Sequence, residues 1–131
     1  MTRFDFRRAA AVGAAITLGI LAATAQAEPS NKWRIKFNRT ADNDGTIVLR
    51  VAPIGAEPID VETQIPKGTS ENSVASKVRD SLKAALGKKN YRIATDDGED
   101  VLIKKAGKTP NFDLTLVRSS VTGVEIKLKH E

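Results

Sequence analysis

The stretch TSENSVASKVRDSLKAALG, residues 69–87, decides the fold, because its apolar residues recur at the spacing of an α-helix. They form one stripe made of Val74, Ala75, Val78, Leu82, Ala85 and Leu86. Thr69 or Ser70 is placed as the N-cap, and Gly87 is placed to end the helix. We therefore predict an amphipathic helix over about 70–86. One such helix cannot form a core by itself, so it must pack against a sheet.

Segments in which polar and apolar residues alternate lie on both sides of this helix and predict β-strands. Before it stand KWRIKFNR (32–39), TIVLRVA (46–52) and IDVETQI (59–65), and after it stand NYRIAT (90–95), DVLIKK (100–105), NFDLTLV (111–117) and GVEIKLK (123–129). In the first of these, Trp33, Ile35 and Phe37 share the inner face. The sequence thus predicts an α+β fold, with a mostly antiparallel sheet of about six to seven strands and the helix packed on one face.

The first 27 residues have the pattern of a cleaved signal peptide. Three arginines precede an apolar run at 9–23, which is shorter than the roughly 20 residues that span a bilayer. Small residues at Ala25 and Ala27 predict cleavage after Ala27, and Arg7-Arg8 leaves twin-arginine export open beside general secretion. We expect a periplasmic or extracellular protein that is not a lipoprotein, since the chain has no Cys. Residues 28–131 should form a single domain with no integral membrane segment.

The predicted mature chain is mildly basic. The sequence holds 21 Lys and Arg and 16 Asp and Glu, of which residues 1–27 contain three Arg and one Asp, so residues 28–131 carry a net charge of +3. Basic residues mark the polar sides of the first and last predicted strands, at Lys32, Arg34, Lys36, Lys127 and Lys129. If these strands are neighbours, their outer sides form one positive surface that suits an anionic polymer. Charged alternation is also typical of protected sheet edges.

The segment DDGED, residues 96–100, is a dense acidic cluster. Asp97-Gly98 favours a tight hairpin turn, because both positions of such a turn take a positive φ. Asp96, Asp97, Glu99 and Asp100 are weak candidates for a metal site, but a calcium loop spreads its ligands over about a dozen residues. We interpret the segment as a hairpin tip and expect neither a metal nor a cofactor.

Catalytic chemistry has few candidates in this chain. There is no Cys, and the only His is His130, next to the end of the sequence, where it is expected to fray. Thiol chemistry and zinc sites built from Cys and His are therefore excluded, and a nucleophile would lack a well-placed base. We predict no catalytic residues and a protein that is not an enzyme.

Residues 45–121 show a further pattern in the order of their segments. GTIVLRV is followed by an alternating strand and a Pro-Lys-Gly turn, and then by TSENSVASKVRDSLKAAL, YRIATDDGEDVLIKKAG and NFDLTL. This order resembles the small β–β–α–β–β modules of contractile phage tail sheath proteins and tail-derived assemblies. The resemblance implies a packing or surface-interaction module without an active site.

Together, these features favour a secreted or periplasmic, non-enzymatic module that acts through its surface, by binding another protein or by self-assembly. One alternative is the binding of an anionic cell-envelope polymer, such as a polysaccharide or lipopolysaccharide, or of nucleic acid, through the basic strand face. Another is a periplasmic inhibitor or immunity-type protein that presents a rigid loop to an enzyme.

Overall fold

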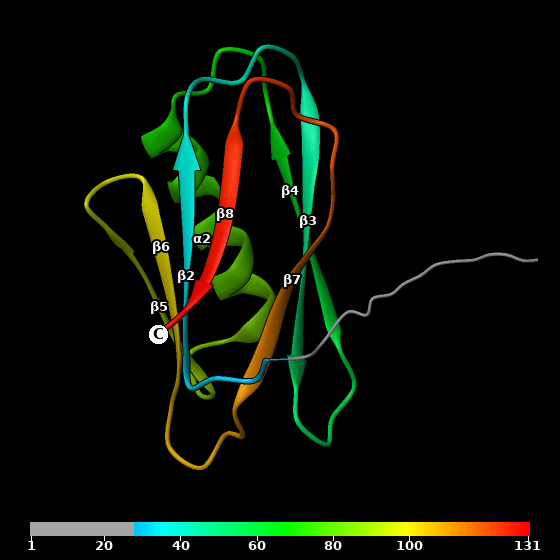
Figure 1. Ribbon diagram of the computed structural model, residues 1–131, viewed down its shortest axis with the longest axis vertical. Helices are drawn as coiled ribbons and strands as arrows, with labels where there is room; N and C mark the ends of the chain where they lie inside the picture. Colours follow the sequence, from blue (N-terminus) through cyan, green and yellow to red (C-terminus); the bar gives the residue numbers. More distant parts are fainter. Residues whose placement is uncertain (1–27) are drawn as a thin grey trace, which may run out of the picture.

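A computed structural model describes residues 28–131, which form two antiparallel sheets and one α-helix (Figure 1). The predicted signal peptide and its cleavage site after Ala27 lie outside the described residues. In chain order the elements are β2 (Lys32–Asn38), β3 (Gly45–Pro53), β4 (Ile59–Ile65), α2 (Glu71–Leu86), β5 (Tyr91–Asp96), β6 (Asp100–Lys105), β7 (Phe112–Ser119) and β8 (Glu125–His130). The α+β class, the seven strands and the single helix of this region are confirmed.

The expectation of one continuous sheet is wrong, because the strands divide into two. One sheet has the order β5-β6-β2-β8 and the other the order β4-β3-β7. The chain passes between them four times: through the loop 39–44 after β2, through α2 after β4, and through the connections after β6 and after β7. β2 therefore lies inside its sheet and is not a protected edge, whereas β8 is at the edge. Alternation indicates which residues face inward, but it does not indicate which strands pair.

The helix α2 packs against the inner side of the four-stranded sheet and beside β4 (Figure 1). Its buried residues are Val74, Ala75, Val78, Leu82 and Leu86. Ala85, which the sequence placed on the stripe, is exposed because it falls at the border of the stripe, beyond the part that the sheet covers. Ser70 is the N-cap, but its side chain makes no capping hydrogen bond to the helix backbone, and the Gly87 N–H donates to the Lys83 carbonyl at 3.0 Å.

The core lies between the two sheets and the helix and contains every aromatic residue of the described chain. Trp33, Phe37, Tyr91 and Phe112 are all at most 6% exposed. Trp33 also joins the sheets, since its indole Nε1–H on β2 donates to the Phe112 carbonyl on β7 at 2.9 Å. The aromatic side chains thus help to hold the two sheets together.

Candidate binding surface

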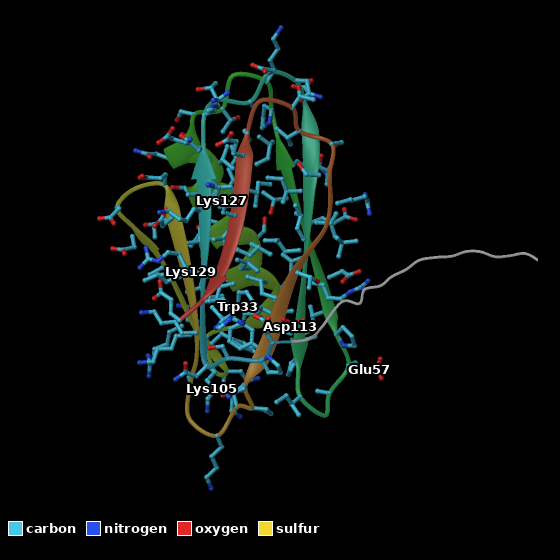
Figure 2. All side chains as sticks on the ribbon, viewed as in Figure 1. Trp33, Glu57, Lys105, Asp113, Lys127 and Lys129 are labelled. Carbon is cyan, nitrogen blue, oxygen red and sulfur yellow. The ribbon has the colours of Figure 1, made fainter. Side chains whose placement is uncertain are left out.

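The outer side of the four-stranded sheet collects the basic residues that the sequence singled out. β2 pairs with β8, with Arg34 opposite Lys129 and Lys36 opposite Lys127. On its other side β2 pairs with β6, with Lys32 opposite Lys104. Because neighbouring residues of paired strands share a face, the predicted condition that the first and last strands are neighbours is met. Figure 2 shows Lys127 and Lys129 along β8 on this face.

Two further basic residues join this surface that sequence reasoning missed. Arg92 on β5 pairs with Lys104 on β6 and continues the row that Lys32 begins. Alternation does place Arg92 and Lys104 on the polar sides of their strands, so the signal was present in the sequence. The sequence did not indicate that they continue the basic row of β2, because this depends on the pairing of β6 with β2 on one side and with β5 on the other. We name this surface the basic face and define it by Lys32, Lys36, Arg92, Lys104, Lys127 and Lys129.

Arg34 lies at the centre of the same side but has a different role. Its Nη1 contacts Asp96 at 3.0 Å and Asp100 at 2.6 Å, and its Nε contacts Glu131 at 2.6 Å. Hydrogen bonds from Glu131, Asp100 and Asp96 raise the pKa of Arg34 above its ordinary value. Arg34, followed by Lys32, holds the pKa of Glu131 below its ordinary value. The Arg34 charge is therefore already matched by protein carboxylates, and we leave Arg34 out of the basic face.

The acidic cluster forms a hairpin tip between β5 and β6, as predicted. Asp97 has φ 52° and Gly98 has φ 81°, so both turn positions have positive φ. Asp96 and Asp100 face each other across the hairpin and share Arg34. Asp100 differs from the prediction, since it is 3% exposed and does not project into solvent at the tip. Across residues 28–131, no group of three or more His, Asp or Glu side chains is arranged to hold a metal ion.

The basic face is largely free of internal ion pairs. Lys32 contacts Glu131 at 3.3 Å. The other five members make no salt bridge with any residue from 28 to 131. A hollow of about 310 Å³ lies at one end of this face, where Lys36 and Lys127 stand beside Glu99 and Glu125. The face therefore offers unpaired ammonium groups together with carboxylate acceptors in one depression.

His130 is better ordered than the sequence predicted. It is the last residue of β8, its ring packs edge-on against Trp33 with centroids 5.4 Å apart, and its Nε2 lies 2.9 Å from Glu28 Oε1. The expectation of fraying is therefore wrong, because the pairing of β8 with β2 holds this end of the chain. The imidazole therefore contacts an indole and a carboxylate in this structure.

The fold and this surface define a small α+β protein with an exposed, charged sheet face. Comparison with models of known protein families finds none that matches the chain, and comparison with curated proteins finds no match either. The resemblance to phage tail sheath modules stays a prediction. Within the described part of the chain, no helix is both long and apolar enough to cross a membrane.

Proposed function

We propose that this chain is a secreted or periplasmic, non-enzymatic binding module that holds an anionic polysaccharide of the cell envelope on its basic face. The observation that carries the proposal is the antiparallel register of β2 with β8, which sets Lys36 directly beside Lys127. Export rests on the predicted signal peptide that ends at Ala27. Amino-terminal sequencing of the exported protein checks it, and a first residue other than Glu28 would contradict that cleavage site.

Like charges occupy directly opposed positions on this sheet. Lys32 stands opposite Lys104, and Lys104 stands opposite Arg92 on its other side. Lys36 stands opposite Lys127 on β8 and opposite Asp100 on β6, and the Asp100 carboxylate is bonded to Arg34. Directly opposed like charges destabilise a sheet, so the face is less favourable alone than it is with a bound anion. An anionic polymer offsets this repulsion at several positions simultaneously, because its charges repeat along the chain. The arrangement therefore favours a polyanion over a single small ion.

A polysaccharide fits this surface better than a nucleic acid does. Single-stranded nucleic acids bind proteins largely by stacking their bases on exposed aromatic side chains. The four aromatic residues of the described chain are buried. The hollow beside Lys36 and Lys127 also contains Glu99 and Glu125, whose carboxylates can accept hydrogen bonds from the hydroxyl groups of a sugar.

The experiment compares the retention of the purified exported protein on immobilised heparin, used as a model sulfated polysaccharide, over a series of salt concentrations. We expect binding at low ionic strength that weakens steeply as salt screens the charges. The double substitution Lys36→Glu with Lys127→Glu should lower the salt concentration of elution, because it reverses two adjacent charges. An equal mass of a single-stranded oligonucleotide serves as the competing ligand.

The matched control is the double substitution Lys67→Glu with Lys77→Glu, which changes the net charge equally but lies away from the basic face. Lys77 is on α2 and Lys67 is in the loop before it, and both are exposed. Equal loss of retention in the two double variants would refute a localised site. Tighter binding of the oligonucleotide than of heparin would refute the choice of a polysaccharide.

A further inference from the structure

A second concave site lies at the end of the molecule where the helix finishes. Three connections enclose it: the β3–β4 loop at 54–58, the segment 87–90 that follows α2, and the β6–β7 loop at 106–111. Figure 1 shows these three connections gathered at the lower end of the molecule. The cavity has a volume of about 540 Å³, which is within the range of roughly 300–1,000 Å³ that is typical of small-molecule sites. It does not share a residue with the basic face.

The walls of this cavity are mainly apolar. They are provided by Pro53, Ile59, Leu86, Tyr91 and Pro110. Leu86 and Tyr91 are buried and Ile59 is partly buried, so the wall is continuous with the core and is not an isolated surface patch. Proline rings and a tyrosine ring present rigid surfaces, and such surfaces suit a flat, apolar ligand body.

The charged residues of the cavity lie at its mouth. Lys89 and Lys108 are exposed, and Glu57 is the one acid of the lining. Figure 2 shows Glu57 at the outer edge of its loop. None of the three makes a salt bridge with another residue in the range 28–131. With two unpaired ammonium groups against one carboxylate, the mouth favours an anionic group on a ligand.

Tyr91 lines the same cavity and carries a hydroxyl that is buried behind the cavity wall. Its hydroxyl is closed off from solvent and has no hydrogen-bond partner within the described chain. Its ring packs edge-on against Phe112 with centroids 5.2 Å apart. Burial raises the pKa of the Tyr91 hydroxyl, so the group keeps its proton at neutral pH. A buried polar group without a partner is unfavourable and is uncommon in folded proteins.

We propose that this cavity binds a small aromatic carboxylate that carries an oxygen acceptor at the end opposite its charge. The carboxylate lies at the mouth beside Lys89 and Lys108, and the ring contacts the apolar wall. The far oxygen accepts a hydrogen bond from the Tyr91 hydroxyl, after that side chain turns toward the cavity. The new hydrogen bond favours this rearrangement, since the hydroxyl has no partner within residues 28–131.

The test uses 4-hydroxybenzoate and two matched probes, benzoate and 4-hydroxybenzyl alcohol, with the purified exported protein. Benzoate lacks the far oxygen, and the alcohol lacks the charge. We expect 4-hydroxybenzoate to bind most tightly in calorimetric titration, by roughly 3- to 10-fold over benzoate, as one net hydrogen bond predicts.

Two sets of substitutions separate the contribution of the Tyr91 hydroxyl to binding from that of the two lysines at the mouth. Tyr91→Phe should abolish the preference for 4-hydroxybenzoate over benzoate while leaving the protein at least as thermally stable, because it removes an unpaired hydroxyl. The double substitution Lys89→Gln with Lys108→Gln should weaken both acids and leave the alcohol unchanged. Lys127→Gln, on the basic face, is the control and should change none of the three affinities.

Two results would overturn the proposal. The first is the absence of saturable binding of either acid at concentrations up to about 10 mM, which is weaker than any specific site is expected to be. The second is binding that the Tyr91 and lysine substitutions leave unchanged. Neither result bears on heparin retention, because the two sites have no residue in common, so this proposal and the proposed function fail or succeed separately.

Discussion

Replacing Arg34 by methionine should destabilise the protein far more than an ordinary surface substitution does. Arg34 is the common partner of Asp96, Asp100 and Glu131, and it connects β2 to the β5–β6 hairpin and to the end of the chain. Methionine preserves an unbranched apolar stem, so packing of the aliphatic part is largely retained. The substitution therefore isolates the loss of the guanidinium.

The exposure of the partners sets the expected magnitude. The Asp100 side chain is 5% exposed and the Arg34 side chain 19% exposed, so their pair is mostly buried. Exposed ion pairs contribute about 0.2–1 kcal/mol, whereas removing one partner of a fully buried pair costs about 3–5 kcal/mol. An intermediate loss of about 2–3 kcal/mol is expected for Arg34→Met, since Asp100 would keep a buried carboxylate without a cation. In a domain of this size, that loss lowers Tm by roughly 10–15 °C.

Urea unfolding followed by Trp33 fluorescence measures this loss. Trp33 is the only tryptophan of the sequence, and it bridges the two sheets, so its emission reports the loss of tertiary structure. The control is Arg50→Met, which breaks the pair of Arg50 with Asp60, whose side chains are 46% and 45% exposed. The reasoning is refuted if Arg34→Met lowers the free energy of unfolding no more than Arg50→Met does.

Two further predictions follow from the same structure. Because Arg34 and Lys32 hold the pKa of Glu131 below its usual 4.5, the Glu131 carboxylate stabilises the fold above that pH, and the contribution is lost as the pH falls through the lower folded pKa. Glu131→Gln should therefore lower the free energy of unfolding at pH 7 but not at about pH 2, and an equal difference at both pH values in urea titrations would contradict this. Gly123→Ala should cost roughly 1–3 kcal/mol, because Gly123 has φ 88° and an added Cβ would lie 2.5 Å from Asp42 Oδ2. Gly55→Ala tests backbone strain alone, since φ is 78° there with nothing within 4 Å, and equal thermal destabilisation of the two variants would rule out the steric effect.

The helix and the hairpin turn could be predicted from the sequence, because the patterns that indicate them lie within a few neighbouring residues. The helix begins within one residue of its predicted start and ends at Leu86, as the stripe and Gly87 indicated. The Asp97-Gly98 turn was predictable because few residue pairs accept positive φ at both positions. Helix periodicity and turn preferences depend on residues that lie close together in the sequence, so both can be predicted from the sequence alone.

The division into two sheets could not be predicted from such signals. Strand pairing depends on how far the loop 39–44 carries the chain and on which apolar faces the helix can cover, and both depend on distant residues. The role of Arg34 was misread for the same reason. In the sequence it is one of three evenly spaced basic residues on β2, and only the pairing of β2 with β6 brings Asp100 beside it.

Because β2 lies inside its sheet, the basic residues on its outer side have two different roles. A strand with neighbours on both sides has side chains at its middle that meet charged groups from two directions, and Arg34 meets Asp100 on one side and Glu131 on the other. Lys36, two residues further along, has Lys127 on one side and Asp100 on the other. The Asp100 carboxylate is bonded to Arg34, and Lys36 makes no salt bridge within the described chain. Arg34 therefore stabilises the sheet through its ion pairs, whereas the Lys36 ammonium group remains able to bind an anionic ligand. A substitution at Arg34 that also weakens heparin retention would act through the fold, whereas one at Lys36 would act on the ligand directly.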